Sequence, residues 1–134
     1  MYTILHRWPG VPKVHWCGVE GDYAVIVLDA LGPNLETLLE YCGGTFSLKT
    51  VLLIAKQALR RLQRVHSTWN VHCDIKPENL VMGSGKQGTT LYLIDFGNSV
   101  GRRNPDVRHS TEPNGTPLFA SIDQNRGLGA FFSF

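Results

Sequence analysis

The sequence predicts an α+β fold, and three observations support that prediction. Two apolar runs near the amino terminus, 14–17 and 23–28, flank a glycine-containing turn, which is typical of paired strands. Apolar residues then recur with the period of a helix over residues 47–66. Two further apolar runs, 80–82 and 91–94, flank a glycine-rich segment and predict a β-hairpin.

The first two strands are joined by residues 18–22, whose glycines and acidic residues suit a turn. We expect the second strand, 23–28, to be wholly buried, because it is apolar along its whole length. A Gly-Pro pair ends this strand, and Asn34 can cap a short helix over residues 35–41. The element order up to this point is therefore strand, strand, short helix.

The long helix predicted from Ser47 has apolar positions that fall on one side of it. They predict a continuous buried stripe of Leu48, Val51, Leu52, Ala55, Ala58, Leu59, Leu62 and Val65. Most lysine and arginine residues of this segment fall on the other side, where a solvated helix face explains them better than nucleic-acid binding. Further on, residues 98–117 have little periodicity and many polar residues, which predicts a long mobile loop.

Size and composition indicate one globular domain without a strong charge preference. The chain has 134 residues, is 43% apolar and carries a formal charge of +2, which gives no argument for nucleic acid or an anionic membrane as a partner. Its three cysteines contain no C-x-x-C pair, so we expect a reducing intracellular setting, cytoplasmic or nuclear. No secretory signal or membrane-spanning run is recognisable, and the oligomeric state is not indicated.

A cluster of polar residues in the middle of the chain has the pattern of phosphoryl-transfer chemistry. Asp74 supplies a carboxylate that can take a proton from a hydroxyl, and Lys76 supplies a cation for the transferring phosphate. Asn79 and Asp95 supply oxygen ligands for Mg²⁺, which the predicted hairpin between them would bring together. Taken singly, each residue has a commoner explanation as a turn former, cap or surface residue. Taken together and in this order, they favour catalysis, and we expect His72 to serve as scaffold.

The ordered set of H-x-D-x-K-P-x-N, an apolar hairpin and D-F-G resembles the catalytic half of a protein kinase. A lysine two places after the loop aspartate, as at Lys76, is typical of kinases that act on serine or threonine. Four segments look in more detail like the casein kinase 1 group. They are 31–36, 74–79, 81–83 and 115–122.

This resemblance implies a partial protein kinase domain over residues 11–123 and an unmatched tail over 124–134. The implied fold is mainly the helical core of the lower lobe, with a catalytic β-hairpin and two strands of the upper sheet. The implied cofactors are ATP and Mg²⁺, and the implied partner is a protein substrate with a serine or threonine hydroxyl. Thr116 would hydrogen-bond near Asp74 and Lys76.

The resemblance also implies an adenine site. Leu28 would be the gatekeeper, and the backbone at Asp29 and Leu31 would meet the base. Val81 and Ile94 would form the apolar floor beneath it.

Several departures from the kinase pattern limit this interpretation. Cys73 stands where the family usually has arginine, and neither a G-x-G-x-x-G loop nor a V-A-I-K lysine precedes Val11. Beyond Ile122 the sequence stops matching, so we expect exposed apolar surface and little activity from this chain alone. A pseudokinase or protein-interaction module is the alternative function, and an incomplete gene product with an aberrant end is a third reading.

Overall fold

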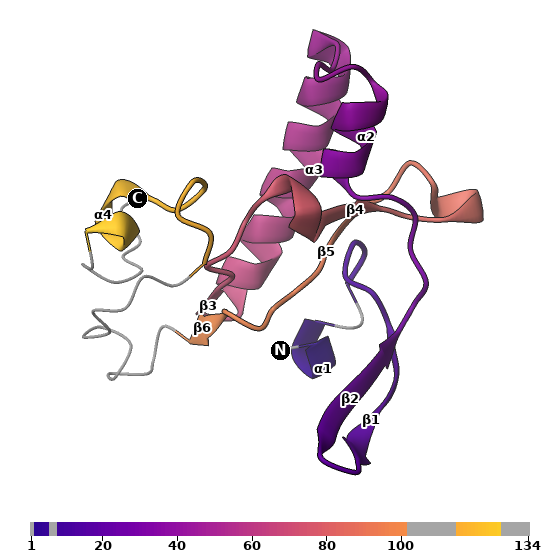
Figure 1. The fold of residues 1–134 in the computed structure, drawn as a ribbon, viewed down its shortest axis with the longest axis vertical. Coiled ribbons are helices and arrows are strands. Elements are labelled where there is room, and N and C mark those ends of the chain that lie inside the picture. The colour runs from indigo at the N-terminus through magenta and orange to yellow at the C-terminus, as the bar shows by residue number, and fades with distance from the viewer. Residues whose placement is uncertain (1, 6–7, 102–114, 127–134) are drawn as a thin grey trace.

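The computed structural model describes residues 2–5, 8–101 and 115–126. Its helices and strands confirm the predicted α+β class (Figure 1). In chain order they are α1 (Tyr2–Leu5), β1 (Val14–Glu20), β2 (Tyr23–Leu28), α2 (Leu35–Tyr41), α3 (Leu48–Ser67), β3 (Asn70–Val71), β4 (Leu80–Met82), β5 (Leu91–Leu93), β6 (Val100–Gly101) and α4 (Ile122–Asn125). Short 3₁₀ turns occupy Pro77–Asn79 and Gly85–Gln87.

The strands form three separate antiparallel pairs, β1 with β2, β3 with β6, and β4 with β5. Helix α2 and the amino-terminal part of α3 lie at one end of the molecule, and the β1–β2 hairpin lies at the opposite end (Figure 1). Helix α1 and the β4–β5 hairpin lie between these ends. The β4–β5 hairpin is therefore central to the fold.

The β1–β2 hairpin is longer and more exposed than the sequence predicted. β1 continues to Glu20, which pairs with Tyr23, so the turn narrows to two residues. The prediction that β2 is wholly buried is wrong, because the Tyr23 side chain is 76% exposed and Ile26 and Val27 are also exposed. An apolar sequence buries a strand only where another layer packs against it, and within the described residues no layer covers this hairpin.

Both predicted helices begin with side-chain caps. The Asn34 Oδ1 accepts a hydrogen bond of 2.8 Å from the backbone N–H of Thr37. The Ser47 Oγ accepts one of 3.2 Å from the N–H of Thr50. Each cap satisfies a backbone donor that the first helical turn leaves without a partner. The predicted starts of α2 and α3 are thereby confirmed.

The predicted buried stripe of α3 is only partly present. Val65 is fully buried and Leu62 packs beside it, but Leu52 and Leu59 are 60% and 67% exposed. Only the carboxyl-terminal end of α3 packs against the core, and its amino-terminal half extends beyond it. The stripe prediction is therefore wrong for most of the helix, although the exposed apolar surface that we expected is present.

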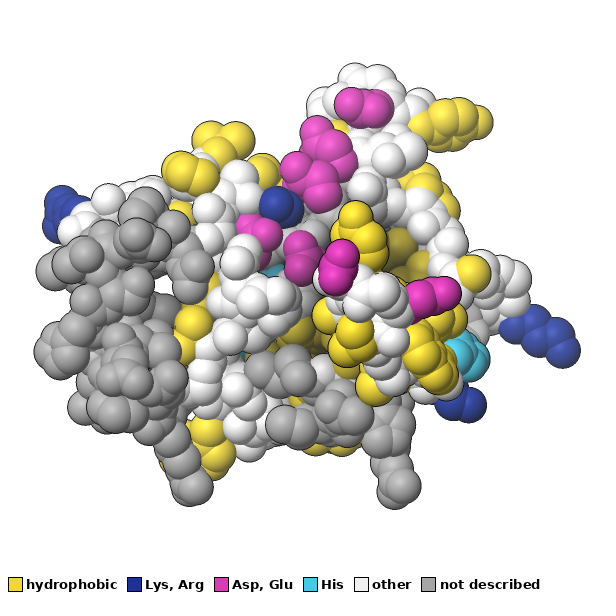
Figure 2. All heavy atoms as spheres, turned by 60° about the horizontal axis from the view of Figure 1, so that its bottom comes forward, with side chains coloured by type: hydrophobic (Ala, Val, Ile, Leu, Met, Phe, Trp, Pro, Cys, Tyr) yellow, Lys and Arg dark blue, Asp and Glu magenta, His cyan; other side chains and the backbone are white. Residues whose placement is uncertain are grey.

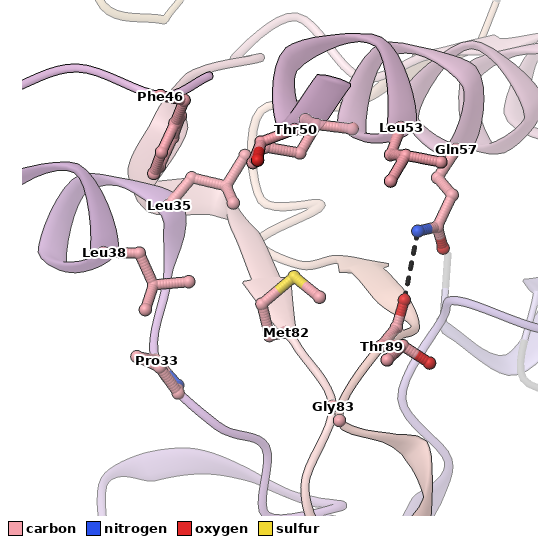
Figure 3. A pocket seen from close by; sticks show the side chains of 12 residues that line it. Pro33, Leu35, Leu38, Phe46, Thr50, Leu53, Gln57, Met82, Gly83 and Thr89 are labelled. Atoms are coloured by element: carbon pink, nitrogen blue, oxygen red, sulfur yellow. Dashed lines mark hydrogen bonds between the residues drawn. The ribbon is translucent and has the colours of Figure 1, made fainter. Parts of the chain in front are cut away.

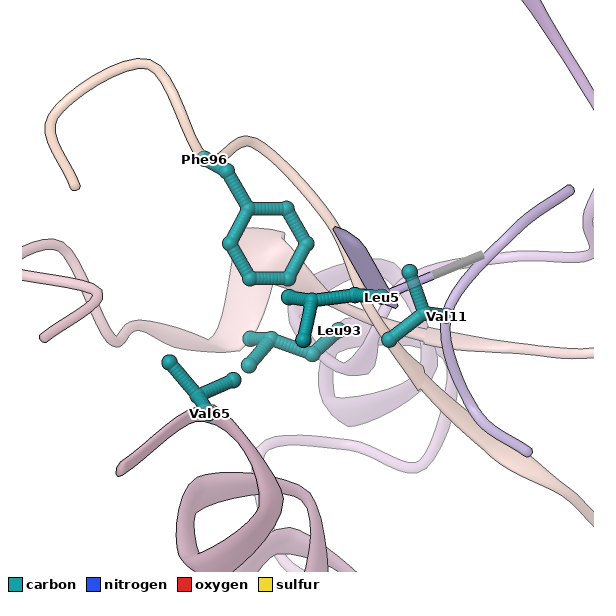
Figure 4. Packing of buried hydrophobic residues seen from close by; sticks show 5 residues of the cluster. All are labelled: Leu5, Val11, Val65, Leu93 and Phe96. Atoms are coloured by element: carbon teal, nitrogen blue, oxygen red, sulfur yellow. The ribbon is translucent and has the colours of Figure 1, made fainter. Parts of the chain in front are cut away.

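The hydrophobic core draws one residue from each of several distant segments. Its buried members are Leu5, Val11, Val65, Leu93 and Phe96, which converge in Figure 4. Helix α1, which the sequence analysis did not predict, contributes the fully buried first member of this cluster. The core therefore includes the end of β5 and Phe96, which follows that strand.

The outer edge of β5 is closed by groups from outside the sheet. The N–H of Leu91 donates to the Oε1 of Gln57 at 2.9 Å, and its carbonyl accepts from the Nε of Arg61 at 3.0 Å. The N–H of Leu93 donates to the carbonyl of Gly10 at 2.8 Å. Gly10 has φ of +84°, and a Cβ there would overlap the Arg61 side chain, so glycine is required at this position.

The outer edge of β4 is closed by the segment that precedes α2. The N–H of Met82 donates to the carbonyl of Pro33 at 2.9 Å, and the N–H of Gly32 donates to the carbonyl of Met82 at 2.8 Å. The β4–β5 hairpin is thus held on both edges, which fixes the backbone on which the candidate site is built.

The predicted loop over 98–117 and the predicted tail over 124–134 fall only partly within the described residues, because 102–114 and 127–134 lie outside them. At the start of the loop, β6 pairs with β3, which the sequence did not predict. At the start of the tail, α4 extends to Asn125.

Candidate active site

Asp74 is the centre of a closed hydrogen-bond network. The residue is 6% exposed, and its Oδ1 accepts from both the backbone N–H and the hydroxyl of Thr116, at 3.0 and 2.8 Å. Oδ2 lies 3.1 Å from the Nζ of Lys76 and 3.2 Å from the Nδ2 of Asn79. The Lys76 Nζ also donates to the Thr116 hydroxyl at 2.9 Å. Four side chains that are up to 42 residues apart in sequence therefore form one unit.

These contacts determine the protonation state of Asp74. Burial raises its pKa, but the hydrogen bonds from Thr116 and Lys76, together with the positive charge of Lys76, outweigh burial and lower the pKa below its usual value. The carboxylate is therefore ionised at neutral pH. An ionised carboxylate is the state that can accept a proton.

A glycine makes the approach of Thr116 to Asp74 possible. Gly115 has φ of +90°, and a Cβ at that position would overlap the carbonyl oxygen of Cys73. Cys73 itself has φ of 66°, which is uncommon for a residue with a side chain. Unusual backbone conformations at Cys73 and Gly115, on facing segments, thus bring residues 73–74 and 115–116 together.

Asn79 is oriented by the same network. Its Nδ2 donates to the Asp74 carbonyl at 2.8 Å as well as to the carboxylate, and Asn79 is buried. With the amide nitrogen used in this way, the amide oxygen is the atom left for another ligand. Asn79 therefore presents the kind of oxygen donor that a hard cation prefers.

Asp95 follows β5 and is exposed to solvent. The hydrogen bond from the N–H of Ile94 to the carbonyl of Asn79, at 3.0 Å, joins the two segments that carry the predicted metal ligands. The Oδ1 of Asp95 accepts a hydrogen bond from the N–H of Gly97 at 3.3 Å. One amide and one carboxylate oxygen fit Mg²⁺, which keeps several waters and takes phosphate oxygens as further ligands.

No cluster of three or more histidine, cysteine, aspartate or glutamate side chains occurs within the described residues. A site closed by protein ligands alone, as in structural zinc centres, is therefore not found in this part of the chain. Acidic side chains nevertheless gather in the middle of one face, beside a lysine or arginine side chain (Figure 2).

His72 connects the two carboxylate-bearing segments as a neutral ring. Its Nε2 donates to the carbonyl of Ile94 at 2.9 Å, and its Nδ1 accepts from the N–H of Asp74 at 3.3 Å. Burial lowers the pKa of His72 below 6.5, against the opposing effects of the Ile94 carbonyl and the two aspartates. These contacts match the scaffold role expected of His72.

Two of the five residues predicted to bind adenine line one cavity of the described part of the chain. Asp29 and Leu31 line a polar cavity of about 290 Å³ together with Ala30, Ser84, Lys86, Gln87 and Tyr92. Leu28, Val81 and Ile94 do not line it. Val81 pairs with Tyr92 across the β4–β5 hairpin, so the two share a face of that hairpin.

The Asp29 side chain is already engaged within the β1–β2 hairpin. Its carboxylate accepts from the Lys13 N–H at 2.8 Å and lies 2.7 Å from the Nε2 of His15. These two contacts, with the Lys13 N–H first, lower the pKa of Asp29. The backbone N–H of Asp29 donates to the carbonyl of Lys13, so it is not available to a ligand in this arrangement.

A second cavity, of about 510 Å³, was not anticipated by sequence reasoning. It lies between α2, α3 and the β4–β5 hairpin, and Leu35, Leu38, Phe46, Leu53 and Met82 point toward it (Figure 3). None of the residues that line it belongs to the Asp74 network. The available signal was Leu53 and Ile54, which the predicted stripe of α3 left out, together with the apolar positions of α2, to which the sequence reasoning gave no role.

Comparison with known families agrees with this geometry. A family model described as protein kinase domain matches residues 8–121, which is most of the chain. The chain therefore belongs to the protein kinase family. None of the helices in the described part of the chain combines the length and the apolar composition that crossing a bilayer requires.

Proposed function

We propose that this chain carries the catalytic segment of a serine/threonine protein kinase of casein kinase 1 type, which transfers the γ-phosphate of ATP to a protein hydroxyl. The observation that carries the proposal is the closed network of Asp74, Lys76, Asn79 and Thr116. Family membership supports kinase chemistry in general. The position of Lys76, two residues after Asp74, favours an alcohol rather than a phenol as the acceptor.

In the proposed reaction, the substrate oxygen forms a bond to the γ-phosphorus while the bond from that phosphorus to the β,γ-bridging oxygen breaks. The proton of the attacking hydroxyl passes to the carboxylate of Asp74, which its lowered pKa keeps ionised. The ammonium of Lys76 lies beside that carboxylate and neutralises charge on the transferred group.

Asn79 and Asp95 would hold Mg²⁺ through their side-chain oxygens, and a bound Mg²⁺ would neutralise the charge of the phosphates. The hydrogen bonds of Asn79 to Asp74 support this role, because they fix the amide next to the proposed base. The Asn79 side chain thereby connects the proposed metal site to the proposed base, Asp74.

The donors around Asp74 impose a condition on this mechanism. Its two oxygens accept four contacts, from Thr116 twice, Lys76 and Asn79, which is about the full capacity of a carboxylate. A substrate hydroxyl must therefore displace one donor. Lys76 is the best candidate, because it can transfer its contact from the carboxylate to the incoming phosphate.

The adenine assignment to Leu28, Asp29, Leu31, Val81 and Ile94 stays part of the proposal. The polar cavity beside Asp29 and Leu31 supports it on one side. Because the Asp29 N–H is bonded to Lys13, the carbonyl at Asp29 and the backbone at Leu31 are the groups left to meet the base.

The test measures binding and transfer separately on the 134-residue chain. We expect MgATP to bind, measured by calorimetry, and Asp95→Asn to weaken that binding in the presence of Mg²⁺ while leaving metal-free binding unchanged. Transfer is measured from labelled ATP to an acidic peptide with one serine, with the same peptide carrying threonine or tyrosine as specificity controls. Transfer by the wild type above background that Asp74→Asn leaves unchanged would contradict the role of Asp74.

A protein-interaction module without catalysis is the second candidate, and the exposed apolar surface favours it. Leu48, Leu52 and Leu59 on α3 and Tyr23 on β2 are all more than half exposed, which is typical of surfaces that meet another chain or segment. Absence of any nucleotide binding, together with tight capture of a protein ligand by this face, would favour the module over the enzyme.

A further inference from the structure

The peptide group that joins Ile94 to Asp95 is held on both sides by aromatic side chains. On one side, the Nε2 of His72 donates to the carbonyl of Ile94 at 2.9 Å. On the other side, the N–H of Asp95 donates to the hydroxyl oxygen of Tyr2 at 2.9 Å. Tyr2 lies in α1, 93 residues away in sequence and outside every motif that the site contains.

The ring of Phe96 fixes both of these side chains. The Tyr2 ring meets it edge-on, with centroids 5.0 Å apart and planes at 84°, and the His72 ring lies 4.9 Å from it at 59°. Edge-on and tilted contacts at these distances are favourable for aromatic rings. Because Phe96 is buried in the core, the three rings form a support with little freedom to move.

Asp95 needs such a support because of its backbone. Its φ is 60°, in the left-handed region that residues with side chains seldom adopt. This conformation turns the chain sharply, so that Asp95 is exposed while the next residue, Phe96, is buried. Without a fixed peptide on its amino side, the residue would relax to a commoner conformation and its carboxylate would move.

We propose that the Tyr2 hydroxyl is a positioning group, which holds the Asp95 backbone in the conformation that directs its carboxylate toward the metal site. The inference rests on the proposed function for the metal-binding role of Asp95. The metal site then also depends on α1, because displacement of α1 breaks the hydrogen bond between Tyr2 and the Asp95 backbone. Burial raises the pKa of Tyr2, partly offset by the backbone N–H groups of Asp95 and Phe96, so the hydroxyl is neutral across the physiological range.

The test uses Tyr2→Phe in the full chain, because this change removes the hydroxyl and keeps the ring that contacts Phe96. Tyr41→Phe is the matched control, since Tyr41 is an exposed tyrosine at the end of α2. Amide hydrogen exchange is followed by NMR. We expect exchange at the Asp95 amide to become about tenfold faster in Tyr2→Phe alone, with exchange at Leu93 unchanged. An unchanged rate at Asp95 would overturn the inference.

A second measurement separates positioning from local stability. Mn²⁺ with ATP serves as a paramagnetic probe, and broadening of the Asp95 and Asn79 signals reports its binding. We expect the Mn²⁺ concentration at half-broadening to rise about threefold to tenfold in Tyr2→Phe and not in Tyr41→Phe. Faster exchange with an unchanged Mn²⁺ midpoint would overturn the inference alone. No broadening in the wild type would overturn the proposed function and this inference with it.

Discussion

The two ends of α3 have the same apolar period and opposite environments. At its carboxyl end, Leu62 and Val65 pack into the core beneath β5. In its amino-terminal half, Leu48 and Leu52 are exposed, and so is Leu59 just past the middle. Periodicity thus marks the face that can be buried, whereas burial itself depends on a partner at the right place.

A similar contrast holds for polar groups. The polar side chains near the carboxyl end of α3 satisfy one another, as Asp74, Lys76, Asn79 and Thr116 do. Within this network the buried donors and acceptors are paired with one another, as buried polar groups usually are. The amino-terminal half of α3 presents exposed apolar side chains instead, and these contribute to stability only where another surface covers them.

The largest difference should appear between a truncation in the core against which the carboxyl end of α3 packs and one on the exposed face of α3. Leu93→Ala, at a fully buried position, should lower the free energy of unfolding by about 2–5 kcal/mol because it removes apolar contacts and leaves a cavity. Leu59→Ala, on the exposed face, should change it by less than about 0.5 kcal/mol. Urea unfolding of both variants measures the difference, and equal losses would show that the exposed face is covered in solution.

Removing one hydroxyl from the Asp74 network should have a smaller effect. Thr116→Val should destabilise the fold by about 1–2 kcal/mol, because the Lys76 ammonium and the Asp74 carboxylate each lose a partner. The pKa of Asp74 should rise, since the Thr116 hydrogen bond is one of the causes that lower it. NMR titration measures that change. Thr45→Val, at an exposed threonine, is the control and should alter neither quantity.

The pH dependence of stability should reveal the buried histidine. Burial lowers the pKa of His72 in the folded state, so between that pKa and about 6.5 the unfolded chain binds more protons. Its contribution to stability is therefore complete above pH 6.5 and is lost as the pH falls through the folded-state pKa. Urea unfolding from pH 8 to pH 5 should show this loss.

His72→Gln should flatten the slope without removing it, because burial also lowers the pKa of His66. If His72→Gln kept the full wild-type dependence of the unfolding free energy on pH, that dependence would come from groups other than His72.

The smallest change in stability is expected on the exposed half of α3. Replacing Leu48 and Leu52 together by lysine should alter the free energy of unfolding by less than about 0.5 kcal/mol. It should also reduce the binding of a dye that reports apolar surface. A loss above about 2 kcal/mol would mean that these leucines are buried in solution, and the contrast between the two ends of α3 would then fail.

Local signals predicted the elements well. The helix cap at Asn34, the start of α3 at Ser47 and the glycine-rich turn of the β4–β5 hairpin lie where the sequence placed them, because each depends on chemistry within a few residues. The motif residues Asp74, Lys76, Asn79 and Thr116 are brought together in space. Whether they catalyse transfer remains a prediction.

Other features depend on long-range packing that no local pattern encodes. The burial of β2 and of the α3 stripe was overestimated, because apolar composition does not say whether a second layer exists. The hydrogen bond between Tyr2 and Asp95 and the pairing of β3 with β6 join segments far apart in sequence. A single sequence gives no signal for such pairs, since in each of them at least one partner lies outside any recognisable pattern.

The closed edges of the β4–β5 hairpin have a consequence for association. Gln57, Arg61 and Gly10 occupy the hydrogen-bonding groups along β5, and the segment at Pro33 occupies those along β4. An incoming extended chain finds no open ladder there, so cross-β growth cannot start from the strands that carry the candidate site. Fibril formation by this protein would have to begin at another segment, and its earliest stages would leave this hairpin folded.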